Sequence, residues 1–269
     1  MLPSADMRII EAIILAIIEG ITEFLPISST GHMALASAWM GIQDDTFTKL
    51  FEIVIQFSAI LSVVVLYWRR FINIRSWQFY AKLLLAIVPA LACGALLKDH
   101  IEALLGRPIV IASILVAGGV ILLFVDGWFR EVSTTQHDDI SYRQAFWIGC
   151  YQVLAVVFPG LSRSAATIIG GMQQRLSRPL AAEFSFFLAV PTMFAASAKS
   201  LYDVYREAPS VLSTDNLSLL LLGSAISFVV ALVVIRFFIV YLQRNGFRVF
   251  GWYRILAGLI MAALILSGE

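Results

Sequence analysis

Apolar residues fill eight stretches of the chain, and the short segments between them carry most of its charge. Six of these stretches approach or exceed the length of about 20 residues that a membrane-spanning helix requires. They are residues 50–68, 79–97, 108–129, 180–198, 217–242 and 249–266. The pattern therefore predicts an all-α polytopic membrane protein with six transmembrane helices.

The two remaining apolar stretches, 9–25 and 145–158, are too short to be convincing spans. Each ends at a proline, continues through a serine-rich loop and is followed by a short apolar piece, 33–40 or 165–172. Such broken pairs favour re-entrant helices. Irregular backbone at membrane depth is tolerated only where it is buried in protein or lines a cavity, so each pair is expected to enclose a polar site.

The broken pairs occupy corresponding positions in the two halves of the chain. Each half contains one re-entrant pair and three spans, and an odd number of crossings reverses the orientation of the second half. The sequence thus predicts a single membrane domain over 1–269, built as an inverted-topology repeat of about 7–130 and about 140–267. The tips of the two pairs should meet in the protein interior.

Composition supports a membrane protein and excludes several other classes. Of 269 residues, 60% are hydrophobic and 14% charged, and the mean hydropathy is +0.87. A formal net charge of +1 without a basic tract gives no reason to expect nucleic acid as a partner. Cys93 and Cys150 both lie in apolar stretches, where a structural disulfide or zinc site is not expected.

Lysine and arginine are unevenly distributed between the two sides of the predicted topology. One side carries Arg69, Arg70, Arg75, Lys82, Arg130, Arg143, Arg175, Arg178, Arg244 and Arg248. The other carries only Arg8, Lys49, Lys98, Arg107, Lys199 and Arg206. The positive-inside rule makes the first side cytoplasmic. Both termini are then outside, and the first re-entrant pair opens outward.

Two acids stand in the first broken pair, where charge is costly and therefore indicates function. Glu19 and Glu23 are four residues apart, so they share one helix face and repel each other. A metal ion, an arginine or a shared proton would relieve that repulsion. The alternative is a pair of acids that only satisfy buried donors.

The loop that follows these acids carries three hydroxyls, a glycine and an imidazole: Ser28, Ser29, Thr30, Gly31 and His32. The hydroxyls can cap the next helix, whose free N–H groups favour an anion. Ordinary capping would need only one of them. His32 is a candidate general acid, general base or nucleophile toward phosphorus.

The second serine-rich loop contains Pro159, Gly160, Ser162, Arg163 and Ser164. The planar fork of an arginine suits bidentate phosphate binding, and neighbouring N–H groups add to it. Arg163 can equally be the counter-ion of the two acids, and the two roles are compatible.

Other polar residues within apolar stretches are weaker candidates, because several lie near segment ends where long side chains reach the interface. They are Glu52, Gln56, Asp126, Glu183, Arg236 and Arg254. Gln56, on the first full span, is the best of them as a residue that lines the site.

The two loops repeat one another only in part. Gln152 precedes Pro159 by the same seven residues that separate Glu19 from Pro26. At this spacing Glu23 is matched by Val156 and His32 by Ala165. Catalysis is therefore expected in the first copy alone.

The motifs EGITEFLPISSTGHM at 19–33 and PGLSRSAATIIGG at 159–171 closely resemble the two signature motifs of the bacterial undecaprenyl-diphosphate phosphatase family, UppP or BacA. The resemblance extends over nearly the whole chain. It includes FEIVIQFSAILSVVVLYWRR at 51–70, YRQAFWIGC at 142–150 and EFSFFLAVP at 183–191.

The resemblance implies hydrolysis of undecaprenyl diphosphate, the C55 lipid carrier of cell-wall precursors, to undecaprenyl phosphate and inorganic phosphate. The reaction is expected at the outer face of the bacterial cytoplasmic membrane, and with it resistance to bacitracin. The lipid diphosphate and membrane lipid are the implied partners, and a homodimer stays open. A divalent cation, Mg²⁺ or Ca²⁺, is implied as well, with Glu19 and Glu23 as its candidate ligands.

Ser29 is the expected nucleophile, with His32 or Glu23 as its base and a phosphoserine as intermediate. Direct attack by His32, or by water activated by Glu23, stays open. The phosphates would be held by Arg163, the 162–164 loop and the N–H groups near Thr30. The rival hypothesis is a lipid-phosphate flippase or transporter, because broken helices in inverted repeats are typical of alternating access.

Overall fold

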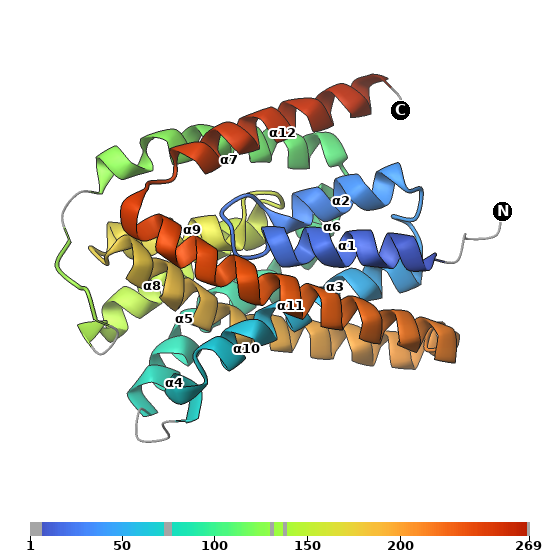
Figure 1. The fold of residues 1–269 in the computed structure, drawn as a ribbon, viewed down its shortest axis with the longest axis horizontal. Helices are drawn as coiled ribbons and strands as arrows, with labels where there is room; N and C mark the ends of the chain where they lie inside the picture. Colours follow the sequence, from blue (N-terminus) through green and yellow to red (C-terminus); the bar gives the residue numbers. More distant parts are fainter. Residues whose placement is uncertain (1–6, 73–76, 130–131, 137–138, 268–269) are drawn as a thin grey trace.

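The computed structural model describes residues 7–72, 77–129, 132–136 and 139–267, and this part of the chain is almost entirely helical. Its β pairing is one isolated bridge between Thr134 and Leu176. The helices, arranged as in Figure 1, are α1 (Ile9–Thr22), α2 (Ser29–Trp39), α3 (Thr46–Leu66), α4 (Trp68–Ile72), α5 (Trp77–Leu96), α6 (Lys98–Leu105), α7 (Pro108–Trp128), α8 (Tyr142–Val157), α9 (Arg163–Gln173), α10 (Arg178–Glu207), the 3₁₀ turn η2 (Pro209–Val211), α11 (Thr214–Arg244) and α12 (Arg248–Ser267).

Six helices of the described chain are long and apolar enough to cross a membrane: α3, α5, α7, α10, α11 and α12. They coincide with the six predicted spans, so the protein is a multi-pass membrane protein, as expected. α10 runs to Glu207, past the predicted end at residue 198, and an ion pair between Lys199 and Asp203 one turn apart lies on this extension. Charged residues at such spacing continue a helix beyond its apolar part.

The two broken pairs are formed by α1 with α2 and by α8 with α9. They have 14, 11, 16 and 11 residues, which is too short for a span. Both second helices start earlier than the apolar pattern indicated, because the serine-rich loops supply their caps. The Ser28 side chain accepts a hydrogen bond from Gly31 N, and the Ser162 side chain accepts one from Ala165 N.

The two halves of the chain pack through one another. α1 packs on α11, α5 on α8, and α7 on α12, so helices of the first half have their main neighbours in the second. In Figure 1, α1 begins and α12 ends at the same end of the molecule, on the right. The predicted bounds of the inverted repeat stay a prediction. Arg75 and Arg130, which entered the charge count above, lie outside the described residues.

The core between these helices is rich in phenylalanine. Phe24 lies just after α1 and contacts Phe186 of α10 edge to face, and Phe238 of α11 contacts Phe250 of α12 in the same way. All four are largely or fully buried. This cluster fixes the loop after α1 against α10, which positions the residues described below.

α8 approaches α5 closely because Gly149 has no side chain. A Cβ atom at this position would lie 2.1 Å from the carbonyl oxygen of Ala86. No Cβ is found so close to a backbone oxygen, so the two helices would have to separate.

We expect Gly149→Ala to lower the free energy of unfolding by about 1–3 kcal/mol, the usual cost of overpacking. Gly127→Ala is the matched control, since nothing lies within 4 Å of a Cβ there. Thermal unfolding of the two purified variants in detergent measures the difference. Equal melting temperatures for both would contradict the close contact of α5 and α8.

Candidate active site

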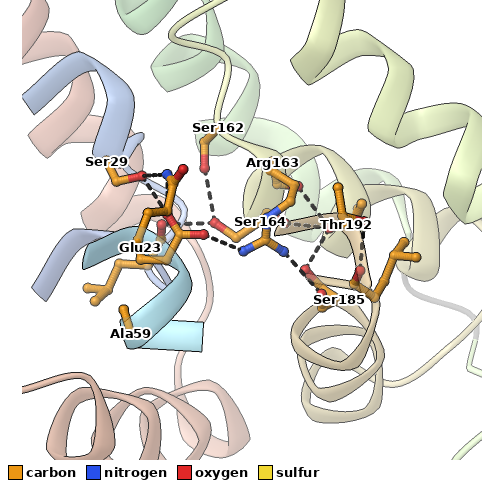
Figure 2. A network of polar contacts seen from close by, with 12 residues as sticks. Glu23, Ser29, Ala59, Ser162, Arg163, Ser164, Ser185 and Thr192 are labelled. Carbon is orange, nitrogen blue, oxygen red and sulfur yellow. Dashed lines mark hydrogen bonds and ion pairs between the residues drawn. The ribbon is translucent and has the colours of Figure 1, made fainter. Parts of the chain in front are cut away.

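Glu23 immediately follows α1, and its carboxylate is the centre of a buried polar cluster. Its Oε1 accepts a hydrogen bond from Arg163 Nη2 at 2.7 Å. Its Oε2 accepts hydrogen bonds from Ser29 Oγ at 2.6 Å and from Gln56 Nε2 at 3.1 Å. Figure 2 shows Ser29 and Arg163 converging on Glu23 from opposite sides. A metal ion, an arginine and a shared proton were the three ways considered to relieve the repulsion between Glu19 and Glu23. At Glu23 the structure shows the arginine.

Arg163 is the first residue of α9 and reaches across the site. Its Nη2 contacts Glu23, while its Nη1 donates to the carbonyl oxygen of Ser185 in α10 at 3.1 Å. The side chain is 13% exposed. The ion pair therefore joins the tips of the two broken helix pairs inside the protein, as the sequence predicted.

The residues that cap α2 and α9 share an unusual backbone conformation. Ser28 has φ 71° and ψ 91°, and Ser162 has φ 77° and ψ 116°. Positive φ is unfavourable for residues other than glycine, and such strain concentrates at functional sites. The same strained conformation occurs in both loops. It is therefore part of how each broken pair enters its second helix.

These caps correct the alignment of the two copies inferred from sequence. One residue separates Pro26 from Ser28, but two separate Pro159 from Ser162. The repeat therefore shifts by one residue inside the loop. At the cap, Ser29 is matched by Arg163 because each is the first residue of its helix, and His32 is matched by Ala166 instead of Ala165.

A cavity of about 390 Å³ lies where the loops meet. It is lined by most of the predicted site residues, namely Glu23, Ser28, Ser29, Thr30, Gln56, Pro159, Gly160, Ser162 and Arg163. Of the weaker candidates, Gln56 alone is among its lining residues. Four predicted residues, Glu19, Gly31, His32 and Ser164, do not line it.

Ser164 joins the two loops, and Gly31 takes part in the cap of α2. Ser164 Oγ donates to the carbonyl oxygen of Leu25 at 2.9 Å and lies 3.0 Å from Ser162 Oγ. The Gly31 N–H donates to Ser28 Oγ at 3.3 Å. Neither group is therefore directed at a ligand in the cavity.

His32 faces α12 and not the cavity. Its Nδ1 lies 2.7 Å from the carbonyl oxygen of Ser28, and its Nε2 lies 2.7 Å from the hydroxyl of Tyr253. A carbonyl oxygen can only accept, so Nδ1 carries the proton and, in the neutral ring, Nε2 accepts from the tyrosine. The base in contact with Ser29 is therefore Glu23.

Sequence reasoning underrated Arg254, which is fully buried on α12. Its guanidinium donates to the carbonyl oxygens of Pro26 and Leu161 from Nη1 at 3.1 and 2.8 Å, and to that of Gly160 from Nη2 at 3.0 Å. Its Nε donates to Leu115 at 3.2 Å. This side chain does not extend to the membrane interface but binds both serine-rich loops.

The space for Arg254 comes from α7. A Cβ atom at Gly118 would lie 2.3 Å from Arg254 Nη2. The sequence contains one signal for this contact, namely an arginine within one apolar span and a pair of glycines within another. The signal indicates a contact only if α7 and α12 are known to pack together. Gln152 and Thr192 were also missed, and both line the cavity.

Glu19 is the second acid and a candidate ligand for a metal ion. It is 1% exposed, and its Oε1 has no hydrogen-bond partner among the described residues. Within the same part of the chain, no group of three or more Asp, Glu, His or Cys residues is placed to hold a metal. Mg²⁺ is commonly held by one or two carboxylates together with substrate phosphates. Glu19 and Glu23 provide carboxylates of this kind, and of the two Glu23 alone is among the residues that line the cavity.

The fold and this site define a multi-pass membrane protein with a polar centre where two broken helix pairs meet. The family model described as "Bacitracin resistance protein BacA" matches residues 12–260. The chain belongs to this family, as the motifs predicted.

Curated relatives cover nearly the whole chain. A protein of Flavobacterium psychrophilum is 54% identical over 255 residues, with 95% of both chains covered. A protein of Porphyromonas gingivalis is 46% identical, with 97% of this chain and 98% of the relative covered. A protein of Aquifex aeolicus is 43% identical, with 95% and 98% covered. Each is named undecaprenyl-diphosphatase.

We expect Arg254→Met to lower the free energy of unfolding by at least about 3 kcal/mol, because several buried carbonyl oxygens lose their donor together. Arg236→Met is the control, since Arg236 of α11 is exposed. Thermal unfolding and limited proteolysis in detergent measure the effect. A melting temperature unchanged by Arg254→Met would show that the loops do not depend on this side chain.

Proposed function

We propose that the protein is an undecaprenyl-diphosphatase, which hydrolyses undecaprenyl diphosphate to undecaprenyl phosphate and inorganic phosphate and so confers resistance to bacitracin. The observation that carries this proposal is the hydrogen bond of 2.6 Å from Ser29 Oγ to Glu23, whose other oxygen is held by Arg163. A hydroxyl, a carboxylate that can act as its base, and a guanidinium thus line one cavity. The relatives of the chain are named undecaprenyl-diphosphatase.

In the first step Ser29 Oγ attacks the terminal phosphorus and Glu23 accepts the proton of the hydroxyl. The bond from that phosphorus to the bridging oxygen breaks, and undecaprenyl phosphate leaves with the proton that Glu23 accepted, so Glu23 is a carboxylate again. Arg163 keeps N–H groups that its contacts with Glu23 and Ser185 do not use, and these stabilise the negative charge of the transferring group. Ser29 is only 7% exposed, so water screens this interaction little.

In the second step water attacks the phosphoserine, and the bond between phosphorus and Ser29 Oγ breaks. The oxygen and one proton of that water leave in inorganic phosphate. The other proton passes through Glu23 to Ser29 Oγ, to which Glu23 is hydrogen-bonded. The serine and the carboxylate are then ready for another cycle. His32 takes no direct part, because its ring nitrogens contact Ser28 and Tyr253.

A divalent cation, Mg²⁺ or Ca²⁺, would be held by Glu19 and Glu23 together with the phosphates. When bound, it would neutralise negative charge on the diphosphate. The support is the buried Oε1 of Glu19, which has no donor within the described chain.

We place the protein in the bacterial cytoplasmic membrane with both termini outside and the cavity open to the outer face. The cavity is lined by Ile101 of α6, which immediately precedes α7. The start of α7 packs beside the end of α12, because Ile111 and Ala112 cluster with Met261. The cavity therefore extends toward the end of the molecule at which α1 begins and α12 ends. Membrane lipid as a partner and a homodimer remain part of this proposal.

A lipid-phosphate flippase or transporter is the second candidate, favoured by the meeting of two broken helix pairs at one site. Transport alone does not require a serine hydroxyl hydrogen-bonded to a carboxylate. The two functions differ in what detergent-solubilised protein does, since flux needs a closed membrane and hydrolysis does not.

We expect the purified protein in detergent to release inorganic phosphate from undecaprenyl diphosphate. Ser29→Ala should lower the rate by at least about a thousandfold, since it removes the nucleophile. Ser113→Ala, at an exposed serine of α7, should retain full activity. Phosphate release is measured colorimetrically. No release by the wild type, together with flux of lipid phosphate in liposomes, would replace the enzyme by the transporter.

A further inference from the structure

Gln152 of α8 is a buried polar residue with one unused group. Its side chain lines the cavity and is 1% exposed. Its Oε1 has no hydrogen-bond partner within the described chain. A buried acceptor without a donor costs free energy, about 1–3 kcal/mol, so such groups call for an explanation.

The orientation of this amide is fixed by Thr192 of α10. The Thr192 hydroxyl donates to the carbonyl oxygen of Leu188 at 2.8 Å, so toward Gln152 it can only accept. Gln152 Nε2 donates to it at 3.4 Å. A reversed amide would set two acceptors against each other. The free group of Gln152 is therefore an acceptor, and its natural ligand is a hydrogen-bond donor.

The position of Gln152 narrows the choice of that donor. The cavity is shared with Ser29 and Arg163. In Figure 2, Arg163 lies between Glu23 and the segment of α10 that carries Ser185 and Thr192. An ionised phosphate offers only acceptors, which an amide oxygen does not attract. Water is the donor that the reaction itself supplies.

We propose that Gln152 is a catalytic residue that accepts a hydrogen bond from the hydrolytic water and orients it toward the phosphoserine on Ser29. Thr192 is the positioning residue that holds the amide. The inference rests on the proposed function. The water oxygen bonds to phosphorus, the bond from phosphorus to Ser29 Oγ breaks, and one water proton reaches Ser29 through Glu23. Gln152 gains and loses no proton. A glutamine that orients an attacking water has precedent in phosphoryl transfer.

The test separates the two steps by rapid mixing of the full-length protein with undecaprenyl diphosphate. In Gln152→Leu the first release of undecaprenyl phosphate should stay fast, at one equivalent per enzyme. Release of inorganic phosphate should slow about a hundredfold, as expected for loss of one group acting on the attacking water. Phosphoenzyme should therefore accumulate. Gln43→Leu, at an exposed glutamine, should behave like the wild type.

Thr192 provides a second, milder variant. Thr192→Val removes the partner of Gln152 Nε2, so it should slow phosphate release in the same step, and Thr192→Ser, which keeps the hydroxyl, should restore it. Trapping by methanol adds a further readout. The share of phosphoryl groups passed to methanol instead of water should rise in Gln152→Leu, because the oriented water is lost.

Three outcomes would overturn the role of Gln152 while leaving the phosphatase intact. In Gln152→Leu, the first is an equal slowing of the release of undecaprenyl phosphate and of inorganic phosphate. The second is a change in KM alone, and the third is a wild-type ratio of phosphoryl transfer to water and to methanol. Failure of the proposed function looks different, because the wild type itself would then release no phosphate. A wild type that turns over without forming phosphoenzyme would overturn both the covalent step and this inference.

Discussion

The structure depends on hydrogen-bond donors for the two loops that interrupt helices at membrane depth. Every carbonyl oxygen there needs a donor, because no bulk water supplies one. Arg254 donates to Pro26 in the first loop and to Gly160 and Leu161 in the second, so one guanidinium serves both. Carbonyl dipoles surround its charge. A buried cation of this kind is costly unless fully hydrogen-bonded, which ties the positions of the two loops to each other.

Joining the loops in this way produces the asymmetry of the site. Both loops enter their second helix through a strained serine cap, Ser28 or Ser162. The next residue differs, being Ser29 in one copy and Arg163 in the other. Glu23 contacts both of them, so a hydroxyl and a cation that belong to different halves share one carboxylate. Neither half contains this cluster by itself.

The hydrophobic pattern predicted the spans because their length and apolarity are properties of each segment alone. Helix ends were less predictable. α10 continues beyond its apolar part through the pair of Lys199 and Asp203, and α2 begins at a serine that the apolar pattern excluded. These ends depend on local hydrogen bonds and charges, to which hydropathy is insensitive.

The candidate site was predicted where it depended on motifs and missed where it depended on packing. Glu23 and Arg163 were expected to meet, and they do. From the sequence, Arg254 resembled an arginine that extends to the membrane interface. Its burial depends on Gly118 of a helix distant in sequence, and the residues around Arg254 in the sequence do not show that contact. His32 follows Ser29 by three residues, yet its ring contacts Tyr253 of α12. The direction in which each of these side chains points is set by packing against a helix far away in the sequence, and no local pattern encodes it.

The central claim, that Ser29 is the nucleophile of a site shared by both halves, is tested most directly by trapping the enzyme during turnover. Undecaprenyl diphosphate labelled in its terminal phosphate is mixed with the wild type and with His32→Ala, and the reactions are quenched separately in acid and in base. Acid-stable label on Ser29 in both proteins, absent from Ser29→Ala, is the expected result. Base-stable label on His32, or no label on a wild type that turns over, would contradict it.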